Sequence, residues 1–208
     1  MNGQLFESHN SISYSYQFLV ELLKEINLAG GRLEIIRRVV SLLKDFMGFE
    51  AVGIRLKEGP DYPYYVSLGF PAYFIEAENY LCAYKPSGDM IRDGDGTPCL
   101  ECMCGNIIRG TFDPSLPFFT PGGSFWTNST SELLASTSQE ERQGETRNRC
   151  NREGYESVAL VPLRSAAETI GLLQVNDKRR DMFSPQTIRF LEDISSTIGI
   201  AVRCAKQQ

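Results

Sequence analysis

Two apolar runs in the last third of the chain decide the fold: residues 155–164 read YESVALVPLR and residues 169–176 read TIGLLQVN. Their β-branched and aliphatic residues, separated by turn residues at 165–168, predict adjacent strands over 157–163 and 169–176. In the Phe183-Ser184-Pro185 segment that follows, Ser184 suits the N-cap and Pro185 the first position of a closing helix. This helix is predicted to run to about Cys204.

The N-terminal half adds helices and a second hairpin. Apolar residues at helical spacing predict helices over 13–28 and 33–47, which end near Gly30-Gly31 and at Gly48. Residues 50–57 alternate as a strand, with Ala51, Gly53 and Arg55 opposite Val52, Ile54 and Leu56. A further strand is predicted over 64–69 and a short helix over 72–80. Terminal helices around an antiparallel sheet, with a long irregular middle, indicate an α+β fold.

Length and composition limit the classes of protein. The chain has 208 residues, which fits one domain over 13–206 after a flexible N-terminus over 1–12. A net charge of −5 gives no electrostatic support for a nucleic-acid partner. No apolar run approaches the length that spans a membrane, and we therefore expect a cytoplasmic protein with reduced thiols.

The runs at 155–164 and 169–176, with the helix start at 183–185, resemble the C-terminal half of a GAF domain, and the likeness extends over 15–205. The resemblance implies a central antiparallel sheet with N- and C-terminal helices on one face and variable loops forming a pocket on the other. It also implies a sensory function: a small ligand, metal or redox cofactor binds, and the signal passes to an output domain such as a histidine kinase. The helices 13–28 and 184–206 have apolar stripes wide enough for a homodimer, which we expect.

The segment 121–130, PGGSFWTNST, is the predicted pocket wall. Small-molecule sites pair aromatic walls with a few placed polar groups, so Trp126, Asn128, Ser129 and Thr130 are candidate ligand-binding residues. The alternative is that Trp126 belongs to the core and that Ser129-Thr130 caps a helix over 132–135.

Four cysteines form the chemical signal of the chain. Cys99, Cys102 and Cys104 lie within six positions, and Cys150 lies among arginines. Four thiolates suit zinc or an iron–sulfur or iron centre. As a redox thiol, Cys150 would have its pKa lowered by the neighbouring arginines. Buried cysteines can also be structural. These three interpretations stay open, whereas the solitary Cys82 and Cys204 are predicted to be core residues.

Cys104-Gly105 before a helix, together with Cys150, is similar to free methionine-(R)-sulfoxide reductase, an enzyme of the same fold. That resemblance implies Cys150 as the nucleophile and Cys104, with Cys99 or Cys102, as resolving thiols. The chain departs from that pattern at Gln174 and Asn176, where the enzyme has acids, and an amide cannot supply a proton. The reductase is therefore the alternative to a non-catalytic sensor.

The basic segment around Cys150 has two interpretations. Arg147 and Arg149 could bind an anionic ligand, because the guanidinium fork matches carboxylate and phosphate. Alternatively, these arginines and Arg152 lie on a solvated face and pair with Glu140, Glu141 or Glu145. His9 is the only histidine and lies in the N-terminal segment, so Cys-His and Ser-His triads are excluded.

Overall fold

The computed structural model describes residues 16–25, 27–28, 30–144, 146–166 and 168–204, so the predicted flexible segment 1–12 lies outside it. Five strands form one antiparallel sheet in the order β2-β1-β5-β4-β3. The strands are β1 (Ala51–Leu56), β2 (Tyr64–Leu68), β3 (Phe125–Thr127), β4 (Ser157–Ser165) and β5 (Glu168–Asp177). The helices after the first, 16–25, are α2 (Arg32–Met47), α3 (Ala72–Glu78), α4 (Cys102–Arg109), α5 (Thr130–Ser136), α6 (Arg149–Arg152) and α7 (Pro185–Cys204).

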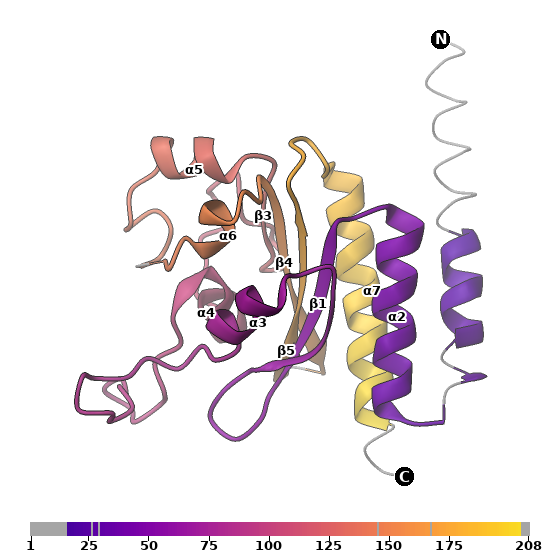
Figure 1. The fold of residues 1–208 in the computed structure, drawn as a ribbon, viewed down its shortest axis with the longest axis horizontal. Coiled ribbons are helices and arrows are strands. Elements are labelled where there is room, and N and C mark those ends of the chain that lie inside the picture. Colours follow the sequence, from indigo (N-terminus) through magenta and orange to yellow (C-terminus); the bar gives the residue numbers. More distant parts are fainter. Residues whose placement is uncertain (1–15, 26, 29, 145, 167, 205–208) are drawn as a thin grey trace.

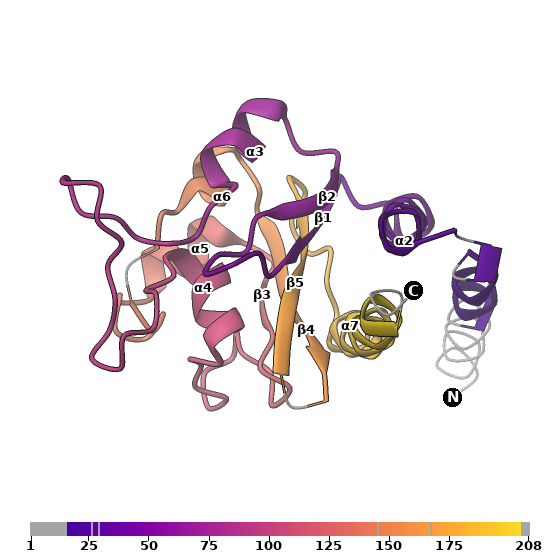
Figure 2. The ribbon, with the colours of Figure 1, turned by 90° about the horizontal axis from the view of Figure 1, so that it is seen from below.

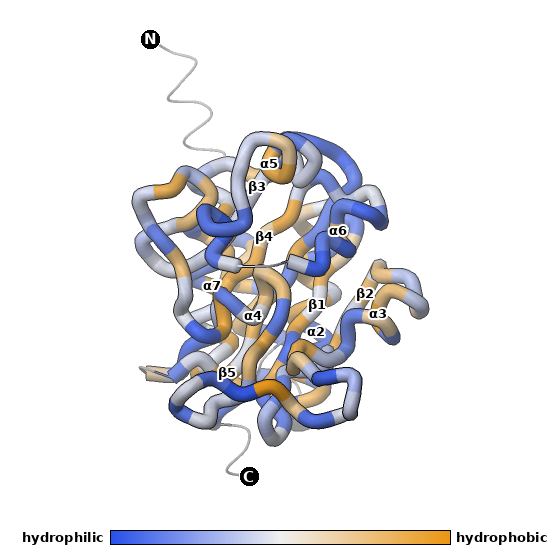
Figure 3. The backbone as a smooth tube through the Cα atoms, turned by 90° about the vertical axis from the view of Figure 1, so that its left-hand side faces the viewer, coloured by the Kyte–Doolittle hydropathy of each residue, from blue (hydrophilic) through white to orange (hydrophobic). Residues whose placement is uncertain are grey.

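The sheet separates two layers (Figures 1 and 2). Helix 16–25, α2 and α7 lie on one face, and α3 to α6 with their long loops lie on the other. Each layer has its own hydrophobic cluster against the sheet. Figure 3 faces the loop layer and shows the apolar strands β4 and β5 behind more hydrophilic segments such as α6. The α+β fold with terminal helices on one face is thus confirmed.

Local sequence signals explain the elements that frame the sheet. The Ser184 hydroxyl caps α7 by accepting from the Thr187 N–H at 3.1 Å, as predicted for an N-cap. Gly199 lets α7 approach β4, because a Cβ there would lie 2.0 Å from the Arg164 carbonyl oxygen. None of the helices within the described ranges combines the length and hydropathy that a bilayer crossing requires.

The alternation predicted for β1 does not separate a buried face from an exposed one. All six residues are buried, and Arg55 has no exposed surface. A sheet covered by structure on both faces has no solvent side, so strand periodicity no longer reports exposure. Arg55 instead points its charge into the loop layer, where it donates to the carbonyls of Tyr62, Asn79 and Glu78 at 3.1, 3.0 and 2.6 Å.

Candidate functional site

The first turn of α4 carries two cysteines on an unusual backbone. Cys102 begins the helix with a φ of 66°, in the left-handed region that residues with a Cβ rarely adopt. The preceding Glu101 N–H donates to the Leu81 carbonyl at 2.7 Å. One turn into α4, Gly105 packs against the backbone of Leu100, so closely that a Cβ on Gly105 would lie 2.7 Å from that backbone. Strained residues cost about 1–3 kcal/mol and cluster at functional sites, so Cys102 marks the candidate site.

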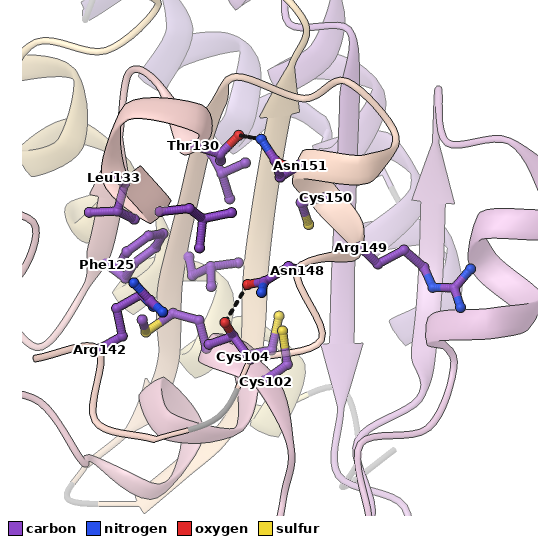
Figure 4. Close-up of a pocket in the computed structure, with 15 residues that line it drawn as sticks. Cys102, Cys104, Phe125, Thr130, Leu133, Arg142, Asn148, Arg149, Cys150 and Asn151 are labelled. Carbon is purple, nitrogen blue, oxygen red and sulfur yellow. Dashed lines mark hydrogen bonds between the residues drawn. The ribbon is translucent and has the colours of Figure 1, made fainter. Parts of the chain in front are cut away.

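A cavity of about 60 Å³ lies over this turn, on the loop face of the sheet. Three cysteines line it, Cys102, Cys104 and Cys150, and Figure 4 shows their sulfurs around its lower and right-hand parts. Its apolar walls come from α4, α5, β3 and β4: Met103, Leu133, Leu134, Phe125, Val158 and Leu160. Three thiols facing one apolar cavity can exchange protons and form disulfides with one another.

The Cys102 thiol is the acidic member of this group. Its pKa is lowered to about 6, chiefly because the Cys104 thiol donates a hydrogen bond to it. Burial and the carboxylate of Glu78 oppose the effect, but the backbone N–H groups of Arg147 and Cys104 also stabilise the anion. Thiols at helix N-termini that accept such donors are the reactive ones in proteins. At neutral pH, Cys102 is therefore mostly thiolate.

The partner thiols are protonated. Donation to Cys102 and burial raise the pKa of Cys104 well above that of an ordinary thiol. Burial likewise raises the pKa of Cys150 to about 12. The expectation that neighbouring arginines make Cys150 the acidic thiol is therefore wrong. The guanidinium groups of Arg147 and Arg149 extend to Glu78 instead, which leaves Cys150 among apolar and amide groups.

Gln174 connects the thiols to a buried polar network. Its Oε1 accepts from the Tyr64 hydroxyl at 2.7 Å and contacts the Cys104 sulfur at 3.9 Å. Its Nε2 donates to Asn176 Oδ1 at 3.1 Å and contacts the Cys150 sulfur at 3.7 Å. The Tyr64 ring in turn lies under the Arg55 guanidinium, at 3.6 Å from its centroid. The two amides, 1% and 0% exposed, orient the thiols but have no proton to donate as an acid.

The predicted metal site is not assembled in the described part of the chain. No three His, Cys, Asp or Glu side chains among these residues are arranged to hold a metal ion. Cys99 does not line the cavity with the other three cysteines. Its N–H pairs with the Ile91 carbonyl at 2.9 Å, in the loop excursion that precedes α4. The zinc or iron–sulfur interpretation of Cys99, Cys102, Cys104 and Cys150 has no geometric support here. Cys82 is buried, as predicted for a core residue. The side chain of Cys204, predicted likewise, lies outside the described part of the chain.

The predicted pocket wall does border a cavity, but a different one. Trp126, Asn128 and Ser129 line a groove of about 590 Å³ at the β3 edge of the sheet. Thr130 faces the cysteine cavity instead, and Leu133 is shared by both. Trp126 also packs partly against the helical core, as the alternative interpretation of this residue predicted.

The polar groups of this segment already have protein partners. The Asn128 amide accepts from the Phe183 N–H at 2.9 Å and donates to the Phe183 carbonyl at 2.8 Å. The Ser129 hydroxyl accepts from the Glu132 N–H and caps α5, as the alternative interpretation predicted. The Thr130 hydroxyl donates to the Tyr155 carbonyl at 2.6 Å. As ligand-binding residues they stay predictions.

The arginines predicted to bind an anion form ion pairs, although with other partners than expected. Arg147 Nε lies 2.8 Å from Glu101, and Arg149 Nε lies 3.1 Å from Glu78. In Figure 4 the Arg149 guanidinium points away from the cavity. These ion pairs hold the segment that contains Arg147 and Arg149 over the thiols. The backbone N–H of Arg147 also stabilises the Cys102 thiolate by a hydrogen bond.

Sequence reasoning missed three residues of the site: Gln174 as a link between thiols, Arg55 over the Tyr64 ring, and Arg142 in the cavity wall. Arg55 and Gln174 sit at strand positions that periodicity alone assigns to no particular role. Arg142 belongs to a polar stretch with no distinguishing motif. The CxC spacing in the sequence indicates that Cys102 belongs to a thiol site. The left-handed backbone that distinguishes Cys102 from Cys104 cannot be read from the sequence.

Comparison with known families identifies the class of protein. The model of the GAF domain family matches residues 31–202, and the chain belongs to this family. A comparison with curated protein sequences finds no match.

Solved structures support the same fold at low sequence identity. The GAF domain of a phosphoenolpyruvate-protein phosphotransferase from Coxiella burnetii is 12% identical, with a TM-score of 0.61 over 94% of this chain and 96% of that one. Free methionine-R-sulfoxide reductase from Neisseria meningitidis, in complex with its substrate, is 13% identical, with a TM-score of 0.57 over 93% and 92%. A methyl-accepting chemotaxis protein is also 13% identical, with a TM-score of 0.57 over 92% and 99%. Such likeness defines the fold alone.

Proposed function

We propose that this GAF domain is a thiol-based redox sensor in which Cys102 is the reactive thiolate and Cys104 the resolving thiol. The observation that carries the proposal is the Cys102–Cys104 pair, with one thiol acidic and its donor strongly protonated. The small volume of the apolar cavity, about 60 Å³, favours a small oxidant over a protein disulfide as the first reactant. GAF domains are typically sensory, and signalling proteins are among the similar structures.

The proposed chemistry uses a peroxide as the oxidant. The Cys102 sulfur attacks one peroxide oxygen, the O–O bond breaks, and hydroxide or alkoxide leaves, which gives a sulfenic acid. The Cys104 sulfur then attacks the Cys102 sulfur, and the hydroxyl group leaves with the Cys104 proton as water. The product is a Cys102–Cys104 disulfide. A dithiol reductant of the thioredoxin class restores both thiols by exchange.

A contact route leads from the cavity to the C-terminal helix. Phe125 lines the cavity, and the preceding Ser124 hydroxyl donates to Glu192 of α7 at 2.6 Å. Thr120 donates to the same carboxylate at 2.5 Å. In this proposal, oxidation repacks the cavity wall and shifts α7 between two arrangements.

The same helices supply the proposed partner surfaces. Leu19 and Leu23 on helix 16–25 are 42% and 55% exposed, and Ile200 on α7 is 60% exposed. These apolar faces support the proposed homodimer through the terminal helices and coupling to an output domain such as a histidine kinase. Light scattering of reduced and oxidised protein tests this part, and a monomer at high concentration in both states would remove it.

Differential alkylation with peptide mass spectrometry tests the redox proposal. Reduced protein is treated with limiting hydrogen peroxide, free thiols are blocked, and disulfides are mapped. We expect Cys102 to be oxidised first and to appear in a disulfide with Cys104, or with Cys150 in the Cys104→Ser variant. Cys102→Ser should leave Cys104 and Cys150 reduced under the same conditions. First oxidation of Cys150 would contradict the assignment.

A second candidate function is reduction of free methionine-R-sulfoxide, which the similar Neisseria structure and three thiols facing one cavity favour. The amides Gln174 and Asn176 weigh against it, because sulfoxide oxygen must be protonated as it leaves. Turnover of the sulfoxide with thioredoxin, lost in Cys102→Ser or Cys150→Ser, would establish the enzyme. If the sulfoxide is not turned over while Cys102 still reacts with peroxide, the redox-sensor proposal remains and the reductase is excluded.

A further inference from the structure

Arg142 is a cavity residue that the redox chemistry does not use. Its side chain is only 8% exposed and lines the same cavity as the cysteines, on the side of Phe125 and Leu133 (Figure 4). Its backbone is fastened to the cysteine helix, because the Asn106 side chain of α4 donates to the Arg142 and Gln143 carbonyls at 3.1 Å each. The arginine is therefore held in the cavity wall and not at a free loop tip.

Half of the Arg142 guanidinium has no partner among the described residues. Nη1 donates to the Thr137 carbonyl and hydroxyl at 2.5 and 2.7 Å. Nε is buried without a hydrogen bond, and no described carboxylate lies within ion-pair distance of the group. Arg55, which is fully buried in the same layer, has by contrast three carbonyl acceptors and the Tyr64 ring.

The pKa of the exposed Glu140 is lowered by hydrogen bonds from its backbone and from Ser138 and, to a smaller degree, by the charge of Arg142, so this carboxylate is the counter-charge of Arg142 but makes no ion pair with it. A buried cation without a directly paired carboxylate is costly, and its cost falls when an anion binds. The unused edge, Nε with Nη2, is the edge on which arginine accepts a carboxylate in a bidentate, fork-like arrangement. Beside it stand the apolar walls of Phe125, Leu133 and Leu160. An anionic head and an apolar body are thus both provided for within one cavity.

We propose that this cavity binds a small organic acid, with its carboxylate on Arg142 and its apolar body between Arg142 and Cys102. A volume of about 60 Å³ accommodates a body of only a few carbon atoms. The proposal extends the redox function by naming a class of substrate: a hydroperoxide that bears a carboxylate would be held with its peroxide toward Cys102. Only this reaction rests on the proposed redox function. Binding of the acid itself is independent of that chemistry.

Protection from alkylation tests the site. Reduced protein is labelled with iodoacetamide, which is uncharged, and the Cys102 rate is followed by peptide mass spectrometry with increasing butyrate or butyramide. We expect butyrate to slow the labelling and butyramide, the matched neutral compound, to have little effect. Arg142→Gln should weaken butyrate protection by about tenfold or more, as expected for loss of a charged hydrogen-bonding fork. Arg142→Lys, which keeps the charge but not the fork, should fall between.

Controls separate this inference from the redox function. Arg152→Gln removes an exposed arginine of α6 and should leave butyrate protection unchanged. Equal protection by butyrate and butyramide, or protection that persists in both Arg142 variants, overturns the carboxylate site. Ligand-observed NMR with butyrate gives a readout without Cys102. Butyrate binding that depends on Arg142, in protein whose Cys102 resists peroxide, would retain the site and remove the redox function.

Discussion

Replacing Cys104 by alanine should remove the main support of the Cys102 thiolate. The Cys104 thiol is the largest cause of the lowered Cys102 pKa, which lies at about 6. Without this donor, burial and Glu78 oppose the remaining backbone N–H groups, and we expect the pKa to rise toward the ordinary thiol value of about 8.5. At pH 7 the thiolate fraction would then fall from about 90% to about 3%.

The assay must follow the pH midpoint and not one rate. Thiolates become more nucleophilic as their pKa rises, with a Brønsted slope of about 0.4–0.5, which offsets much of the loss in thiolate fraction. The rate of Cys102 alkylation by iodoacetamide at neutral pH would therefore change by only a few-fold. The midpoint of the pH–rate profile, measured on the Cys102 peptide, should instead move from about 6 toward 8.5.

Cys104→Ser is the matched control, since its hydroxyl keeps a donor of similar size. Its midpoint should lie between those of the wild type and Cys104→Ala. A wild-type midpoint near 8.5 would refute the thiolate assignment itself. A midpoint that stays near 6 in Cys104→Ala would show that the backbone N–H groups of Arg147 and of residue 104 are sufficient to keep the Cys102 pKa low.

Three further changes test the surroundings of the site. Asp61→Asn should lower the free energy of unfolding by about 1–3 kcal/mol at neutral pH, because the Asp61 carboxylate accepts three buried backbone N–H groups. These hydrogen bonds outweigh burial and lower the pKa of Asp61. In the wild type this stabilisation is therefore present above the ordinary pKa of an aspartate and is lost as pH falls through the folded pKa, which acid titration monitored by circular dichroism would reveal. Gly105→Ala should destabilise by about 1–3 kcal/mol in urea and raise the Cys102 midpoint, whereas Gly94→Ala, with nothing within 4 Å, should do neither. Glu192→Ala removes the acceptor of two hydroxyls and should cost about 1.5–3 kcal/mol; an unchanged urea midpoint would remove this contact from the proposed relay.

The elements that local pattern controls were predictable. The strands β4 and β5, the end of α2 at Gly48 and the Ser184 cap of α7 follow from periodicity and capping residues. Prediction failed where a position depends on residues distant in sequence. Strand β1 alternates in sequence, yet layers on both faces bury it, so the polar-looking Arg55 became a core residue.

The site shows the same limit. Basic neighbours in sequence pointed to Cys150, but Arg147 and Arg149 direct their charges to Glu78, and burial decides the Cys150 pKa. The acidity of Cys102 comes from a thiol two residues away and from an N–H group more than forty residues away, brought together by the fold. The CxC spacing therefore indicated where thiol chemistry lies, but not which sulfur is the anion.

The left-handed backbone of Cys102 gives the most discriminating comparison between function and stability. A residue with a Cβ pays about 1–2 kcal/mol for this conformation, whereas glycine adopts it freely. Cys102→Gly and Cys102→Ala both remove the thiol, so each should abolish peroxide-dependent disulfide formation. Only Cys102→Gly relieves the strain. Its free energy of unfolding, measured in urea, should exceed that of Cys102→Ala by about 1 kcal/mol, opposite to the usual order of these residues in helices. Equal stabilities, or the usual order, would mean that the backbone at Cys102 is not strained. The ordering expected here would mean that the fold tolerates a strained residue at this position in order to keep a thiol there.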